Sequence, residues 1–148
     1  MITNVTIIGN NLHEKLINEY KDYILVGNNF NYQDLKNYKK IIFFLTLDNL
    51  AIEEVRKLFE YLRDNNILFI NITNNIEHTL CTEYLTIYEN STVINSGKTK
   101  EVLLDEKLFK HLGIKRPFII ELSTYLNDYD LIQDNYFDKE SLVSKLWN

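Results

Sequence analysis

The sequence has few residues that cross-link a chain or break its regular structure. Its 148 residues include one cysteine, one proline and four glycines. The single cysteine, Cys81, cannot form an intramolecular disulfide or a thiolate metal site alone, so we expect a small buried apolar residue there. A chain of this length can bury enough apolar surface to fold without a disulfide or a structural metal. Hydrophobic residues make up 45% and charged residues 25% of the chain, which excludes extensive disorder and indicates one globular domain.

Positive charge and long apolar runs are also scarce. The chain has 16 basic and 21 acidic residues, a net charge of −5, so it lacks the basic field of a nucleic-acid-binding protein. The longest apolar run, residues 41–45, is far below the roughly 18 residues of a membrane span. The first residues show no basic and apolar segments of a secretion signal. We therefore expect a cytoplasmic location, with no nucleic acid as partner and no direct membrane insertion.

Short β-rich runs alternate with helical patterns over the first two thirds of the chain. The predicted strands are 5–8, 23–26, 40–45 and 67–72. The clearest helix is 50–66, and a short helix at 77–83 precedes a hairpin formed by 85–88 and 92–94. This alternation predicts a three-layer α/β fold with a mostly parallel sheet and an antiparallel hairpin at its end.

Helical patterns dominate from residue 97 onward. One helix is predicted over 99–112 and ends at Gly113. A second begins at Pro117, and Asp138 is placed to cap a third over 142–147. Because no flexible linker separates the two parts, we predict an α/β core at 1–97 and a helical extension at 98–148 packed on it as one structural domain.

Few residues combine into a recognisable reactive site. The three histidines, His13, His78 and His111, have no partners at spacings that complete a metal site, so we expect no metal and no cofactor. The sequence has no Gly-X-Ser-X-Gly nucleophile turn. Two predicted strands end in Gly-Asn-Asn, at 9–11 and 27–29, before a helix whose first N–H groups could hold an anion. No Gly-Lys-Ser/Thr follows either one, so two tight turns are the simpler interpretation.

Residues 41–147 carry a family resemblance. Leu47 and Asp48 are placed like a D-loop, with a helix at 50–62 and a strand at 67–72 after it. The family's acidic helix and hairpin, its Thr-Pro-(Lys/Arg)-Glu segment and its C-terminal helical extension then have counterparts in the same order, at residues 77–98, 99–103, and 108–118 with 137–146. Together they resemble the C-terminal half of ATP-binding-cassette (ABC) ATPases, most closely those of energy-coupling-factor transporters for vitamins and cobalt. The resemblance implies a RecA-like sheet and a C-terminal helical extension that takes part in subunit pairing.

The departures from that family concern its catalytic motifs. The family's Walker B strand ends in Asp-Glu, whereas this strand ends at Phe44, Leu45 and Thr46. Asn74 occupies the position of the switch histidine. Residues 5–11 resemble the strand before a Walker A loop but lack its Gly-Ser-Gly-Lys-Ser/Thr core, and the Leu-Ser-Gly-Gly-Gln signature has no counterpart. Because phosphate transfer needs the lysine and Mg²⁺ at the phosphates, we expect no hydrolysis and no enzyme activity.

The leading hypothesis is a degenerate ABC-ATPase-like protein that acts by protein–protein contact. The resemblance implies as partner a second copy or a transporter ATPase subunit, and a location peripheral to a membrane transporter. The predicted contact residues lie in the extension: Phe109, Leu112, Pro117, Phe118, Leu142 and Trp147. The alternative is a module that binds a nucleotide or small anion without hydrolysis at the carboxyl ends of the strands. Its predicted residues are Gly9, Asn10, Asn11, Gly27, Asn28, Asn29, Asp48 and Asn74. An enzyme of unrelated chemistry has no residues in its support.

Overall fold

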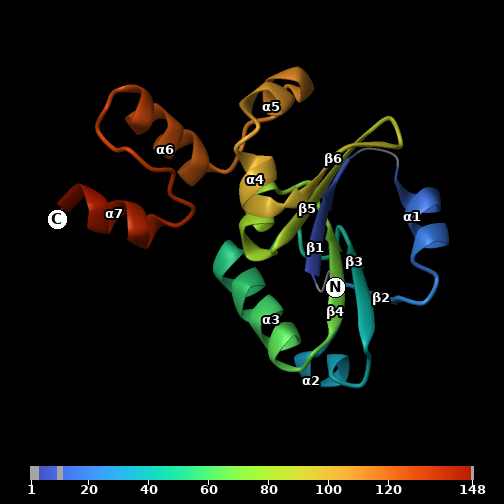
Figure 1. The fold of residues 1–148 in the computed structure, drawn as a ribbon. Coiled ribbons are helices and arrows are strands. Elements are labelled where there is room, and N and C mark those ends of the chain that lie inside the picture. The colour runs from blue at the N-terminus through green and yellow to red at the C-terminus, as the bar shows by residue number, and fades with distance from the viewer. Residues whose placement is uncertain (1–3, 10–11, 148) are drawn as a thin grey trace. The chain divides into compact units, whose positions relative to one another are not determined.

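A computed structural model describes residues 4–9 and 12–147 of the chain (Figure 1). The chain divides into two compact units, Met1–Thr99 and Lys100–Asn148, and each is described by itself. None of the described helices combines the length and the apolar content that a membrane crossing requires.

The first unit contains one six-stranded sheet. Its strands are β1 (Asn4–Ile8), β2 (Ile24–Val26), β3 (Lys40–Phe44), β4 (Leu68–Ile72), β5 (Tyr84–Glu89) and β6 (Thr92–Lys98). They lie in the order β2-β3-β4-β1-β5-β6, and only the β5–β6 pair is antiparallel. The predicted α/β fold with a mostly parallel sheet and a terminal hairpin is confirmed, and it is consistent with a RecA-like or ABC-ATPase-like fold.

Helices cover both faces of this sheet (Figure 1). The helix α3 (Ile52–Asp64) packs on one face, together with the short α2 (Tyr32–Leu35) and the 3₁₀ helix η1 (Ile76–Cys81). The apolar stripe of α3 is fully buried there: Val55, Leu58, Phe59 and Leu62. On the other face, within residues 4–9 and 12–147, the helix that packs is α1 (His13–Glu19), through Leu16 and the preceding Leu12. Unequal helix cover therefore leaves part of the α1 face of the sheet open.

Asn71 is a polar side chain inside the sheet of the first unit. It lies between Thr6 of β1 and Phe43 of β3 in the strand register and is completely buried. Neither its Oδ1 nor its Nδ2 has a hydrogen-bond partner among the described residues. A buried amide without partners costs free energy, because water would satisfy it in the unfolded chain.

We expect Asn71→Val to raise the free energy of unfolding by about 1–2 kcal/mol, since valine removes both unpaired groups and suits a strand. Chemical denaturation measures the change. Thr73→Val is the matched control: the Thr73 hydroxyl accepts a hydrogen bond from the Asn75 N–H at 2.9 Å, so its loss should destabilise. Destabilisation by both variants would contradict this account of Asn71.

The second unit is helical. It contains most of α4 (Thr99–Leu103) together with α5 (Glu106–Leu112), α6 (Phe118–Asp128) and α7 (Lys139–Trp147). The prediction of a single helix over 99–112 is wrong, because the Asp105 side chain accepts a hydrogen bond from the Leu108 N–H at 3.2 Å and starts a new helix. Gly113 does end α5, with φ of +67°. Pro117 precedes α6, and Asp138 caps α7 by accepting from the Ser141 N–H at 2.7 Å.

Arg116 organises the segment between α5 and α6. Its side chain is only 2% exposed, yet it carries a full charge. Its Nε donates to Glu121 at 2.9 Å, and its two terminal nitrogens donate to the Leu103 carbonyl at 3.2 Å and the Thr124 hydroxyl at 3.1 Å. The hydrogen bond from the Arg116 side chain is the main cause that holds the pKa of the Glu121 carboxyl below its usual range. The buried cation is thus matched by partners from two helices, α4 and α6.

Candidate functional site

The carboxyl edge of the sheet brings together the loops that follow β1, β2, β3 and β4. Since these four strands are parallel, the segments after them meet at one edge in the order of the sheet. The loop after β2 is farthest from the loop after β1, because β3 and β4 lie between the two strands. Gly9 and the second Gly-Asn-Asn segment, at 27–29, therefore follow strands that are not neighbours in the sheet.

Asp48 joins the loop after β3 to the loop after β4. One carboxylate oxygen accepts a hydrogen bond from the Thr73 hydroxyl, and the other accepts from the Asn74 N–H at 3.1 Å. The Asn75 side chain donates to the Asp48 carbonyl at 3.5 Å. Two residues predicted for ligand binding, Asp48 and Asn74, are thus brought into contact. Together with the hydrogen bond from Thr73, this contact ties the two loops together, so each carboxylate oxygen of Asp48 accepts a hydrogen bond from the chain.

His78 lies buried next to this junction. Its Nε2 is 3.3 Å from the Leu50 carbonyl, and its Nδ1 is 3.5 Å from the Thr73 hydroxyl. Burial lowers the pKa of His78 below 6.5, against the opposing effects of the Leu50 carbonyl, Asp48 and Glu77. In the folded chain the imidazole therefore stays neutral to a lower pH than an ordinary histidine does.

We expect His78 to make the fold less stable in mild acid. Above pH 6.5 the imidazole is mostly neutral in both the folded and the unfolded chain. Below that pH the unfolded chain binds a proton at His78, whereas the folded chain, with its lowered pKa, does not yet bind one. The stability contribution is lost as the pH falls from the unfolded pKa towards the lowered folded pKa. Unfolding free energies at about pH 7.5 and about pH 5.5 should differ more for the wild type than for His78→Gln. Equal pH dependence in the two proteins would contradict this prediction.

Gly9, at the end of β1, is closely packed against β5. A Cβ atom at this position would lie 2.7 Å from the Tyr88 Cβ, 2.9 Å from Leu12 Cδ1 and 3.1 Å from the Tyr88 carbonyl oxygen. Contacts this close leave no room for a side chain, so the glycine is required by packing. Asn10 and Asn11, also predicted for ligand binding, lie outside the described residues.

The loop after β2 holds the second Gly-Asn-Asn segment. A Cβ at Gly27 would meet no atom within 4 Å, and Gly27, Asn28 and Asn29 are all exposed. Nearby, the backbone after β3 passes through Leu45 with φ of +57°, which is uncommon for a large residue. The Thr46 hydroxyl then donates to the Val26 carbonyl at 3.0 Å and connects this turn to β2. The loop is thus open to solvent but has no converging polar side chains among these residues.

Metal and thiol chemistry have little support at this edge. Within residues 4–9 and 12–147, no three His, Cys, Asp or Glu side chains gather as metal ligands. Burial raises the pKa of Cys81 to about 11, so its sulfur remains a protonated thiol. Cys81 packs in the apolar cluster beneath α3.

The predicted contact residues of the second unit differ widely in exposure. Phe109, Pro117 and Leu142 are buried and Leu112 is partly buried, whereas Phe118 is 70% and Trp147 is 84% exposed. The side chains of Phe109 and Leu142 therefore serve internal packing. Contact with a partner is available to Phe118 and Trp147.

Sequence reasoning missed two features. Tyr125 and Tyr129 are 57% and 64% exposed, their rings are 4.8 Å apart, and they continue the stripe that Phe118 begins on α6. The spacing 118, 125, 129 is helical and could have been read from the sequence. The second feature is an apolar pocket on the α1 face of the sheet, which no local pattern indicates.

The chain is similar to known proteins over about two thirds of its length. No protein-family model matches it. It is 28% identical over 97 residues to the energy-coupling factor transporter ATP-binding protein EcfA1 of Lactobacillus delbrueckii subsp. bulgaricus. This match covers 65% of this chain and 33% of the relative. The EcfA1 proteins of Mesomycoplasma hyopneumoniae and Bacillus subtilis are 28% identical over 102 residues and 24% identical over 103 residues. Each covers 68% of this chain, and 36% and 37% of the relative.

The chain therefore spans about a third of the length of the curated relatives it matches. The structure shows an α/β fold consistent with the corresponding ATPase core, and the matches extend over about two thirds of this chain. Both observations agree with the family resemblance inferred from the sequence. Over these residues, the chain is homologous to the ATP-binding proteins of energy-coupling factor transporters.

Proposed function

We propose that this chain is a non-catalytic, ABC-ATPase-like protein that acts by binding another protein. The partner is a second copy of the chain or the ATP-binding subunit of an energy-coupling factor transporter. In the latter case the chain would lie at the periphery of the transporter, on its cytoplasmic side. The curated relatives are named as transporter ATP-binding proteins, which supports a partner of this class.

The observation that carries this proposal is the exposed aromatic stripe of α6, formed by Phe118, Tyr125 and Tyr129. The three residues recur at helical spacing, so their side chains lie along one side of the helix. Aromatic residues are enriched at the centres of protein interfaces, and tyrosine is frequent among the residues with the largest binding contributions. A row of three large exposed rings, two on α6 and one at its C-cap residue Tyr129, is therefore suited to protein contact.

The alternative of nucleotide binding at the carboxyl edge has weak support from the described residues. The lysine and acidic residues that would hold phosphates and Mg²⁺ have no counterpart in the sequence, and Gly9 is closed in by Leu12 and Tyr88. Both carboxylate oxygens of Asp48 accept hydrogen bonds from the chain itself. Non-catalytic nucleotide binding at this edge is therefore the less favoured proposal.

The proposal is tested by charge introduction on the α6 stripe. We expect Phe118→Asp combined with Tyr125→Lys to abolish association, because the charges are unfavourable at an apolar contact. Each charge also suits its end of the helix macrodipole, so α6 should remain folded. Sedimentation measures self-association, and co-purification with the purified Bacillus subtilis relative measures the second partner class.

Tyr32→Asp combined with Tyr38→Lys introduces the same charges at two exposed tyrosines of the first unit and serves as the control. The control should retain association. Association that survives the α6 changes, or a wild type that binds neither partner, would contradict the proposal. A thermal-shift titration with Mg-ATP tests the nucleotide alternative, since saturation at about 100 times the Kd should raise the Tm by about 5 °C.

A further inference from the structure

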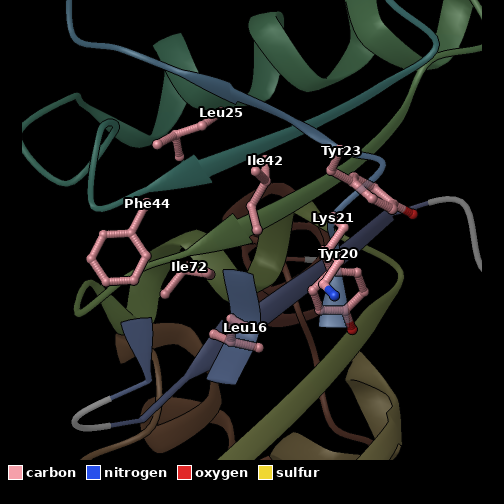
Figure 2. Close-up of a pocket in the computed structure, with 8 residues that line it drawn as sticks. All are labelled: Leu16, Tyr20, Lys21, Tyr23, Leu25, Ile42, Phe44 and Ile72. Atoms are coloured by element: carbon pink, nitrogen blue, oxygen red, sulfur yellow. The ribbon is translucent and has the colours of Figure 1, made fainter. Parts of the chain in front are cut away.

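A pocket of about 170 Å³ lies on the α1 face of the sheet (Figure 2). It is bordered by α1, by the turn that follows it, and by β2, β3 and β4. Because α1 has only seven residues and is the sole helix packed on this face in the described chain, it covers β1 and β4 better than the edge strand β2. The residues that line the pocket are Leu16, Tyr20, Lys21, Tyr23, Leu25, Ile42, Phe44 and Ile72.

Most of the pocket surface is hydrocarbon. Ile42, Ile72 and Leu16 lie in its middle, and Phe44 and Leu25 lie at one end (Figure 2). Cavities of about 150 Å³ with comparable walls bind benzene. The pocket therefore has room for an apolar body of about one ring.

The opposite end of the pocket is polar (Figure 2). It is formed by Tyr20, Lys21 and Tyr23, whose polar atoms lie at the outer ends of their side chains, and Lys21 is the only charged residue among the lining residues. Burial raises the pKa of both tyrosines, so both hydroxyls stay protonated and able to donate hydrogen bonds. The neighbouring Lys40 is engaged by Asp22 at 2.6 Å, whereas Lys21 forms no ion pair within residues 4–9 and 12–147.

We propose that this pocket binds a small carboxylic acid, with its apolar body against Ile42 and Ile72 and its carboxylate at Lys21 and the two tyrosine hydroxyls. Donors and a positive charge at one end, with hydrocarbon at the other, match an anion that carries a compact apolar group. The site lies on the α1 face of the sheet, and its apolar end reaches Phe44 and Ile72, the last residues of β3 and β4. None of the residues predicted for nucleotide binding and none of the α6 stripe lines it.

The probe is phenylacetate, and its neutral isostere phenylacetamide is the comparison. Methyl NMR spectra of the full chain report binding through the methyl groups of Leu16, Ile42 and Ile72. A ligand of about ten non-hydrogen atoms should bind with a Kd on the order of 1 mM. We expect phenylacetate to shift these methyl signals, and phenylacetamide to bind about fivefold more weakly because it lacks the charge.

Two pairs of variants localise the binding. Lys21→Gln should remove the preference for the acid, whereas Lys57→Gln makes the same change in net charge on α3, at the other face of the sheet, and should retain it. Leu25→Trp replaces a leucine that lines the pocket on the edge strand β2 with a larger, aromatic side chain. Ile24→Trp makes a similar enlargement at the preceding residue, whose side chain points to the opposite face. Leu25→Trp should weaken phenylacetate binding at least tenfold, and Ile24→Trp should leave it unchanged.

Several results would overturn the proposal. Unchanged methyl signals with phenylacetate at about ten times the expected Kd would show that the pocket takes no such acid. Equal affinity for phenylacetate and phenylacetamide would remove the role of the charge. Equal effects of the two tryptophan variants would place binding elsewhere.

Discussion

Replacing Arg116 with methionine is expected to lower the free energy of unfolding of the second unit by about 4 kcal/mol. The guanidinium is almost fully buried, and its hydrogen bonds join α4, through the Leu103 carbonyl, to α6, through Glu121 and Thr124. Methionine fills much of the same space but leaves the Leu103 carbonyl without this donor. The loss should therefore come from unpaired polar groups more than from an empty cavity.

Amide hydrogen exchange of α5 and α6 in the full chain measures this effect within the second unit. Lys115→Met is the matched control: it removes the adjacent cation, which is exposed, and should change stability by less than about 0.5 kcal/mol. An Arg116→Met protein as stable as the control would show that the buried ion pair contributes little to this fold.

Replacing Phe59 with alanine is expected to destabilise the first unit by about 4 kcal/mol. Phe59 is completely buried on α3, with its ring centroid 4.5 Å from that of Phe69 on β4 and 6.3 Å from that of Phe43 on β3. The variant loses the transfer free energy of the ring and leaves a cavity that the neighbouring strands cannot fill. Urea denaturation of the full chain, followed by circular dichroism, measures the change.

Phe59→Leu separates ring packing from apolar burial. It keeps much of the buried volume and should cost about half as much as the alanine variant. Glu60→Ala, at the adjacent exposed position of α3, should be nearly neutral. A small effect of Phe59→Ala would mean that α3 is held to the sheet mainly by its other buried residues.

The candidate ligand edge was predicted in part from the sequence. The segments after the first four strands do lie at one edge, because parallel strands place their carboxyl ends together. The contacts that these residues make could not be predicted, because their partners are distant in the chain. Asp48 pairs with Thr73 and Asn74, and Gly9 packs on Tyr88. Local patterns carry no information on such pairs.

The helical extension shows a similar limit. Hydrophobic residues at helical spacing predict that a helix exists, but not which of its residues a neighbour will cover. Phe109 and Phe118 looked equivalent in the sequence, yet the first is buried and the second is exposed. The break between α4 and α5 was missed because the helical pattern over 99–112 has no glycine or proline inside it, whereas the Asp105 side chain caps the second helix.

By itself, the sequence determined the alternation of strands and helices, the parallel character of the sheet, most helix ends and the relationship to transporter ATP-binding proteins. These follow from periodicity, capping residues and motif order, which are local in the chain. The tertiary structure alone decided the strand order, the orphaned amide of Asn71, the ion-pair network of Arg116 and the pocket beside α1. Each depends on contacts between segments that are distant in the sequence, because those contacts decide which side chains are buried and which hydrogen bonds they form.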